Sequence, residues 1–178
     1  GFQQYMFASM HRFDYTIDDC LEFHDSIESV CQPLRHRADK QRMEDLGLNS
    51  LKPWDMGVDV KGRPPLQPFD DVQEMVDGCS RIFHNMSTEL GNYFDQLDAN
   101  DCLDLDSRKG KAPGGYQYYL QKSRLPFIFM NAAGTQRNVE TMIHEAGHAF
   151  HSFYSGHLDL IHERDSPIEF AEVASMAM

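Results

Sequence analysis

Apolar side chains near the start of the chain recur every three or four positions, which is the spacing of one face of an α-helix. Thr16 precedes this run and suits an N-cap, while Gly47 follows it as a candidate C-cap. Pro33 lies inside the run and lacks the backbone N–H that a helix interior uses. We therefore expect a break or a kink at Pro33, giving a helical hairpin or a bent helix. The apolar positions are Ile17, Leu21, Phe23, Ile27, Val30, Cys31 and Leu34.

The next part of the chain alternates between turn-forming and periodic segments. Residues 49–68 are rich in Pro and Gly and predict an ordered loop. Helices are expected from Asp70 to about Met86, and from a cap at Ser87 or Thr88 to about Leu97. Beyond residue 100 short apolar stretches separated by Gly and Pro predict two or three strands. These stretches are Leu103–Leu105, Tyr116–Leu120 and Phe127–Met130. The predicted fold is mainly α with a small β-sheet.

A further helix is predicted over residues 138–155, because its apolar residues form one stripe and no Pro interrupts it. The stripe consists of Val139, Met142, Ile143, Ala146, Phe150 and Phe153. Residues 131–135 read as the turn that leads into this helix. The helix carries the motif His144-Glu145-Ala146-Gly147-His148, whose histidines would flank a core.

The spacing of this motif matches the requirements of a zinc hydrolase. Residues four apart on a helix differ by roughly 40° in direction and about 6 Å in rise, so His144 and His148 can bind one metal ion. Glu145 lies about 100° around the axis and points beside the ion, where a general base takes a proton from water. The same pattern also occurs by chance on solvated helix faces. The motif therefore predicts two ligands and a base, and a peptidase is the leading interpretation.

A catalytic zinc ion usually has three protein ligands, so a third is expected downstream. A metzincin would need Gly at position 151 and His at 154, but this chain has His151 and Tyr154 there, which excludes that class. Ser166-Pro167-Ile168-Glu169 predicts the start of a second helix, with Glu169 in a capping box. Glu172 comes next among apolar neighbours, where a buried carboxylate needs a cationic partner. We expect Glu172, rather than Glu169, to be the third ligand.

These motifs resemble the oligoendopeptidase F and thimet oligopeptidase family of zinc metallopeptidases. In that family a His-Glu-x-Gly-His helix is followed by a Glu-x-x-Ser helix with the last ligand, as in Glu172-Val173-Ala174-Ser175. The resemblance covers about two thirds of the chain. It includes Thr141–His151, Pro167–Ser175, Leu125–Asn131 with Gly134-Thr135, Arg108–Tyr116 and, more weakly, Pro53-Trp54-Asp55.

The resemblance implies a zincin-like helical fold, one Zn²⁺ ion and short oligopeptide substrates. Members of the family are longer, and their catalytic domains continue into a segment with His and Tyr residues that stabilise the oxyanion. This chain starts at Gly1 and reaches Met178 inside the ligand helix. We therefore expect residues 1–178 to be a partial peptidase catalytic domain of a larger enzyme. Its helical part would span about 1–100, and its sheet and metal helices about 101–178.

Other segments could contact a substrate. Phe127–Asn131 could pair with an extended peptide or be an ordinary core strand. The loop Arg108–Tyr116 could hold a substrate carboxylate or be a solvated turn, and it lacks the spacing of a phosphate-binding loop. A role for His151 beside the metal is possible in principle, although simple packing is expected for it and for Tyr154. His157 and His162 are expected at the surface.

The composition narrows the class of partner. Acidic residues outnumber basic residues 28 to 16, for a net charge of -12, which argues against nucleic acid and anionic membranes as partners. No apolar run reaches the length of a membrane span, and the start has no signal-peptide pattern. The four cysteines form no Cys-x-x-Cys pair, which predicts reduced thiols and a cytoplasmic protein.

Two alternative functions stay open from the sequence. The chain could be an inactive metal-binding fragment with a structural role only, because further cleft residues are missing. It could also be a non-peptidase zinc hydrolase. The sequence does not specify which peptide side chains are preferred or how many copies of the chain assemble.

Overall fold

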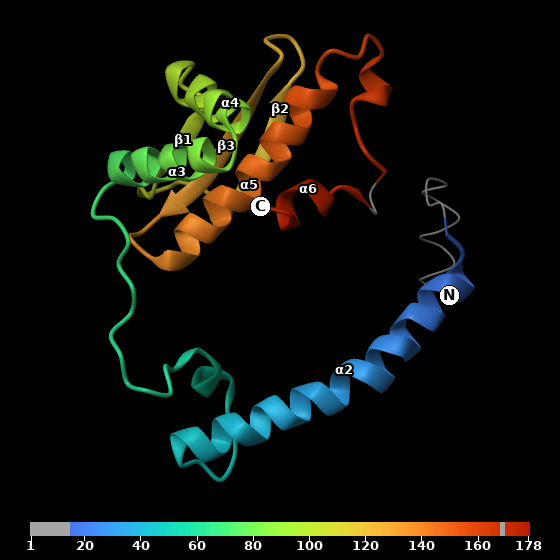
Figure 1. The fold of residues 1–178 in the computed structure, drawn as a ribbon, viewed down its shortest axis with the longest axis vertical. Helices are drawn as coiled ribbons and strands as arrows, with labels where there is room; N and C mark the ends of the chain where they lie inside the picture. The colour runs from blue at the N-terminus through green and yellow to red at the C-terminus, as the bar shows by residue number, and fades with distance from the viewer. Residues whose placement is uncertain (1–14, 168–169) are drawn as a thin grey trace. The chain divides into compact units, whose positions relative to one another are not determined.

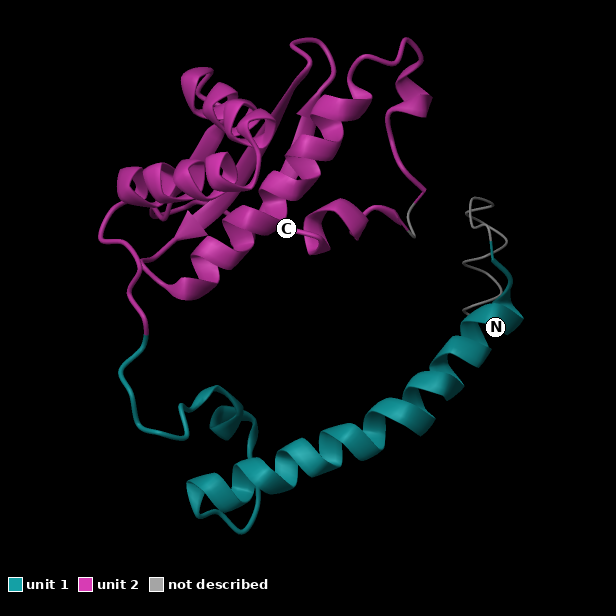
Figure 2. Cartoon of the chain, in the orientation of Figure 1, with its two compact units in different colours: residues 1–65 teal, residues 66–178 magenta. Residues whose placement is uncertain are grey.

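The computed structural model describes residues 15–167 and 170–178, and the chain forms two compact units. Residues 1–65 make up the first unit and residues 66–178 the second (Figure 2). The helices expected in 70–97 belong to the same unit as the sheet. The expected organisation as one partial domain stays a prediction.

The first unit contains one long helix, α2 (Ile17–Leu46), in place of a hairpin. Thr16 caps its start through Asp19, and Gly47 ends it in the left-handed conformation with φ 66°. The helix runs continuously through Pro33 and curves gently (Figure 1). The loop that follows contains a 3-10 turn, Pro53–Gly57, in which Trp54 is 74% exposed. The capping residues were therefore predicted correctly, and of the two alternatives at Pro33 the structure has a gently bent helix and not a hairpin.

The second unit is built on a three-stranded sheet with the order β1-β3-β2. Strand β1 (Leu103–Asp106) is parallel to β3 (Leu125–Ala132), and β2 (Tyr116–Leu120) is antiparallel to it. Alternate residues of β3 are buried, as expected for a strand with one face on a core. The sheet and the predominance of helix confirm the predicted fold class.

Three helices complete the core of the second unit. They are α3 (Val72–Met86), α4 (Thr88–Ala99) and α5 (Gln136–Ser155). Helix α5 crosses the sheet and contacts β2 and β3, while α3 and α4 pack together at its side (Figure 1). The most buried side chains come from all of these layers: Phe83, Phe94, Ile128, Met142 and Phe150. This packing fixes one face of α5 against the core and leaves its other face for chemistry.

Candidate metal centre

Helix α5 begins at the predicted turn and presents the two histidines of the motif on its less buried side. Gly134 takes the left-handed conformation with φ 76°, and the Oδ1 atom of Asn138 accepts a hydrogen bond from the backbone N–H of Thr135. Met142, Ala146 and Phe150 are buried in the core. The side chains of His144 and His148 are 38% and 19% exposed, so both imidazoles can reach a bound ion.

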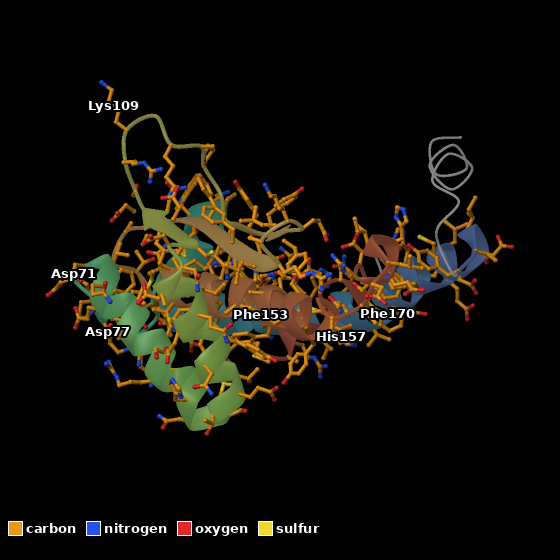
Figure 3. All side chains as sticks on the ribbon, turned by 90° about the horizontal axis from the view of Figure 1, so that it is seen from above. Asp71, Asp77, Lys109, Phe153, His157 and Phe170 are labelled. Carbon is orange, nitrogen blue, oxygen red and sulfur yellow. The ribbon has the colours of Figure 1, made fainter. Side chains whose placement is uncertain are left out.

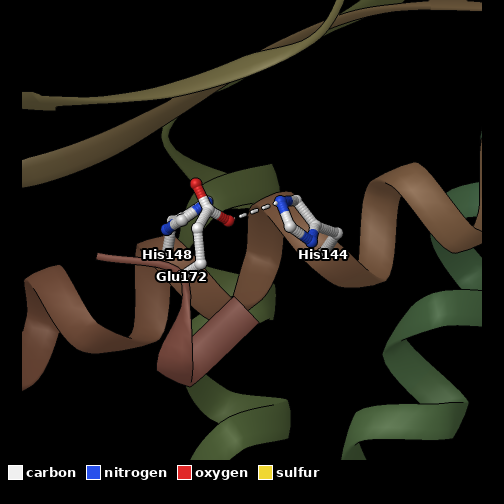
Figure 4. A group of neighbouring side chains, drawn as sticks. All are labelled: His144, His148 and Glu172. Atoms are coloured by element: carbon white, nitrogen blue, oxygen red, sulfur yellow. Dashed lines mark ion pairs between the residues drawn. The ribbon is translucent and has the colours of Figure 1, made fainter. Parts of the chain in front are cut away.

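The structure brings the three predicted metal ligands together (Figure 4). The Oε2 atom of Glu172 lies 3.2 Å from the Nε2 atom of His144 and 3.3 Å from the Nε2 atom of His148. The two imidazole rings are nearly perpendicular, with their centroids 5.0 Å apart. One carboxylate oxygen therefore sits close to both imidazole nitrogens.

These distances fit a zinc ion. Tetrahedral ligands with bonds of about 2.0 to 2.2 Å lie about 3.3 to 3.5 Å from one another, close to the spacing of the carboxylate oxygen from each nitrogen. Two imidazoles and one carboxylate also form a common donor set of catalytic zinc sites. The residues present thus suit zinc by both distance and chemistry.

Glu172 reaches this position from a shorter helix than expected. Helix α6 spans only Val173–Met176, so it begins after Glu172 instead of at Ser166-Pro167. Residues 168 and 169 lie outside the described residues, and with them the alternative ligand Glu169 and the proposed capping box. The Glu172 side chain is 55% exposed, so the expectation that it is buried among apolar neighbours was wrong. Its position depends on how α6 packs on α5.

Glu145 lies beside the three ligands and is only 8% exposed. Burial raises its pKa, and the nearby negative charge of Glu172 acts in the same direction. His148, His144 and a hydrogen bond from the backbone N–H of Gln117 oppose that rise. A carboxyl group with a raised pKa next to two imidazoles suits a group that accepts a proton and then returns it. The sequence did not single out Gln117, because strand periodicity does not reveal which strand packs against α5.

Two depressions open beside the ligands. The larger has a volume of about 520 Å³, and its lining includes His144, Glu145 and Ser175. The smaller, of about 190 Å³, is lined by His148 and Gln117 among others. The larger volume lies within the range of small-ligand sites, so a short chain segment has room on that side.

The sheet edge nearest the ligands belongs to β2. Strand β3 is paired on both sides, so of the two alternatives for Phe127–Asn131 the ordinary core strand is the one found. Among the described strands, β2 has β3 as its only partner, and it contacts α5. Its Gln117 side chain donates a hydrogen bond to the Ser152 hydroxyl at 3.1 Å. The side of β2 that has no partner strand among the described residues therefore runs beside Glu145, which accepts a hydrogen bond from the Gln117 backbone N–H.

The loop Arg108–Tyr116 is anchored to the sheet, because Lys111 points inward. The Lys111 side chain is 1% exposed, and its Nζ atom donates to backbone oxygens of Asp104, Asp106 and Met130. It also lies 4.5 Å from the centre of the Phe129 ring. Lys111 therefore cannot hold a substrate carboxylate in this conformation, whereas Lys109 extends away at the loop tip (Figure 3).

The contacts between this loop and Asp104 should make the free energy of unfolding fall at acid pH. A hydrogen bond from Arg108, supported by Lys111, lowers the pKa of Asp104 to about 2. The stabilisation is present above the ordinary Asp pKa of about 3.9 and is lost as the pH falls toward 2. Urea unfolding between pH 5 and pH 2 should show a shallower loss of stability for Asp104→Asn than for the unchanged protein. Equal slopes would contradict this assignment.

The remaining candidate residues have structural surroundings. Tyr154 donates a hydrogen bond to Glu89 at 2.7 Å, although its side chain is partly exposed and does not belong to the core. His157 and His162 are exposed, as predicted, and His151 is half-buried beside the smaller depression. All four cysteines are free thiols. Within residues 15–167 and 170–178, no helix has the length and apolar content required to cross a lipid bilayer.

Comparisons with known proteins identify the family that this chain resembles. A family model described as peptidase family M3 matches residues 1–178. Group B oligopeptidase PepB of Streptococcus agalactiae is 27% identical over 143 residues, which are 80% of this chain and 23% of that protein. Oligopeptidase PepF of Bacillus subtilis is 27% identical over 145 residues, or 80% of this chain and 21% of that protein.

Solved structures give the same result. A structure assigned to oligoendopeptidase F from Bacillus anthracis matches with a TM-score of 0.88 and 29% identity, over 96% of this chain and 31% of that chain. The structure of PZ peptidase A with inhibitor 2 matches with a TM-score of 0.87 and 30% identity, over 96% and 30% of the two chains. The chain thus spans less than a third of each of these relatives.

Proposed function

This chain belongs to peptidase family M3, and we propose that it carries the metal centre of a zinc-dependent endopeptidase that hydrolyses short peptides. The observation that supports this most directly is the position of one Glu172 oxygen beside the Nε2 atoms of both His144 and His148. The names of the relatives, oligopeptidase and oligoendopeptidase, support peptides as the substrate class.

In this proposal His144, His148 and Glu172 hold one Zn²⁺ ion. When bound, the ion would polarise the scissile carbonyl and lower the pKa of water to about 7. Glu145 accepts a proton from the attacking water and passes it to the leaving amine. Burial of Glu145 favours this exchange, because it weakens the preference of the carboxyl group for the ionised form.

The substrate backbone is proposed to lie along β2. This edge strand presents an unpaired side next to Glu145, and an extended peptide can add to such an edge by main-chain hydrogen bonds. The larger depression would then receive a substrate side chain near His144. Pairing through the backbone is compatible with many peptide sequences.

The free cysteines support a reducing, cytoplasmic location as part of the same proposal.

A second candidate function is a metal-binding segment without activity of its own. It is favoured by the share of the curated relatives that the chain spans, which is 23% for PepB and 21% for PepF. The two functions differ in whether the 178-residue chain hydrolyses peptides alone. The full-length protein and the 178-residue chain therefore both need to be assayed. A non-peptidase zinc hydrolase is not supported by any particular contact in the structure.

Hydrolysis of a quenched fluorescent peptide tests the proposal. We expect the full-length protein to cleave the peptide, to lose at least about 99% of this activity in a zinc chelator, and to regain it when zinc is restored. The 178-residue chain is assayed in parallel, together with metal analysis. Zinc binding without hydrolysis by the chain alone would favour the second function for this segment. Chelator-resistant cleavage by the full-length protein would contradict the proposed function.

A further inference from the structure

Gly147, inside the metal-binding motif, faces α6 at a distance that no side chain allows. A Cβ atom at this position would lie 2.6 Å from the Cα atom of Ser175 and 2.9 Å from the backbone oxygen of Ala174. It would also lie 3.0 Å from the Cγ atom of Met178. The flexible Met178 side chain can move aside, but the other two atoms belong to the α6 backbone. The glycine therefore permits the close approach of α6 to α5.

Ser175, the residue nearest to an added Cβ atom at Gly147, also forms a hydrogen bond with the third ligand, Glu172. Ser175 is 3% exposed, and its hydroxyl oxygen lies 2.9 Å from the Oε2 atom of Glu172 and 2.9 Å from the Glu172 backbone oxygen. The Oε2 atom is the one that approaches both imidazoles. The contact between Gly147 and Ser175 is thus connected to the carboxylate through a single hydrogen bond.

We propose that Gly147 and Ser175 are positioning residues that set the distance from the Glu172 carboxylate to the two imidazoles, and so determine zinc affinity. This inference rests on the proposed function. Neither residue binds the metal itself. Gly147 determines how closely α6 approaches, and Ser175 determines how the carboxylate is directed once α6 is in place.

The geometry leaves little tolerance for error. An added Cβ atom would push the α6 backbone outward by about 1 Å, and a displacement of that size is enough to spoil a preorganised site. Zinc–ligand bond lengths vary by only about 0.2 Å. A longer bond between zinc and the carboxylate oxygen therefore cannot compensate for a displacement of about 1 Å. The Glu172 side chain is 55% exposed, so its surroundings do little to restore its position. Loss of the close contact should therefore weaken zinc binding.

Zinc affinity, measured by competition with a chromophoric chelator, tests this inference on the full-length protein. We expect Gly147→Ala to weaken zinc binding by about 10-fold or more, the range seen when residues that support metal ligands are lost. Ser175→Ala should weaken it by a similar factor, without any steric change. Unchanged affinity in both variants would overturn the inference.

Two other helical glycines provide matched controls. Gly78 has room for a methyl group, since the nearest atom to an added Cβ is the Nη2 atom of Arg81 at 3.8 Å. Gly91 has none, because an added Cβ would lie 2.3 Å from the His84 ring. Gly78→Ala should change neither stability nor zinc affinity to a large extent. Gly91→Ala should lower the Tm but leave zinc affinity unchanged. Equal weakening by Gly91→Ala and Gly147→Ala would mean that general instability, not positioning, is responsible.

The outcome for the unchanged full-length protein separates this inference from the proposed function. If this protein binds no zinc, or if its Glu172→Ala variant binds zinc as tightly, the proposed function fails. If it binds one ion and the Glu172→Ala variant loses it, the metal site stands. Normal binding by Gly147→Ala and Ser175→Ala would then refute only their positioning role. Circular dichroism of each variant shows whether the helices are retained.

Discussion

Replacing Glu145 with Gln should lower kcat for peptide hydrolysis by about three orders of magnitude in the full-length protein while zinc stays bound. Glutamine has the size of glutamate, so the 8% exposed site should still pack around it. The amide has no basic oxygen that can accept a proton from water at neutral pH. His144, His148 and Glu172 are unchanged, and they supply the proposed metal ligands.

The measurement combines steady-state kinetics with metal analysis of the same sample. Glu163→Gln is a matched control, because Glu163 is an exposed carboxylate in the same unit and the same chemical change is made. It should keep normal kcat. Full turnover by zinc-loaded Glu145→Gln would show that another group transfers the proton. Loss of zinc from this variant would instead show that Glu145 supports the metal site.

The parts of the fold that the sequence predicted correctly depend on local interactions. Thr16 and Gly47 act on backbone groups within a few residues, and the strand at 116–120 was predicted from a short apolar stretch that follows Gly and Pro. Pro33 left a hairpin and a bent helix open, because the local sequence does not show whether the helix continues beyond the hydrogen bond that Pro removes. The choice between a substrate strand and a core strand for Phe127–Asn131 was left open for a different reason. Strand order is a tertiary property, and no short pattern states that β3 has neighbours on both sides.

The candidate site divides in the same way. The approach of His144 to His148 follows from helix geometry alone, and the sequence therefore predicted it. The approach of Glu172 depends on how α6 packs on α5, which no local pattern states. Glu172 was chosen from its apolar neighbours and from the family resemblance. The physical argument from burial was wrong, because the Glu172 side chain is 55% exposed. The close contact at Gly147 could not be predicted either. The sequence shows a glycine there, but not that the α6 backbone passes beside it.

The second large effect is a loss of stability, and it is expected when Lys111 no longer anchors the loop Arg108–Tyr116 to the sheet. Replacing Lys111 with Met should lower the free energy of unfolding by about 2 to 5 kcal/mol, because partly buried backbone oxygens lose their hydrogen-bond donor. Methionine keeps the apolar stem but cannot donate hydrogen bonds. Backbone oxygens of Asp104 and Met130, which are partly buried, would lose a donor at 2.9 Å and 2.6 Å. Each unsatisfied oxygen costs about 1 to 3 kcal/mol, which supports the same range.

Urea unfolding at neutral pH measures this effect, with Lys109→Met as its control. Lys109 is exposed at the tip of the same loop, so its replacement should change stability by less than about 0.5 kcal/mol. A Lys111→Met variant as stable as the Lys109→Met variant would contradict the structural role of the buried ammonium group. Because small domains are stable by only about 5 to 15 kcal/mol, a loss of the predicted size removes a large fraction of the total. Selection for folding is then sufficient to explain a buried lysine here, and a contact with substrate is not needed.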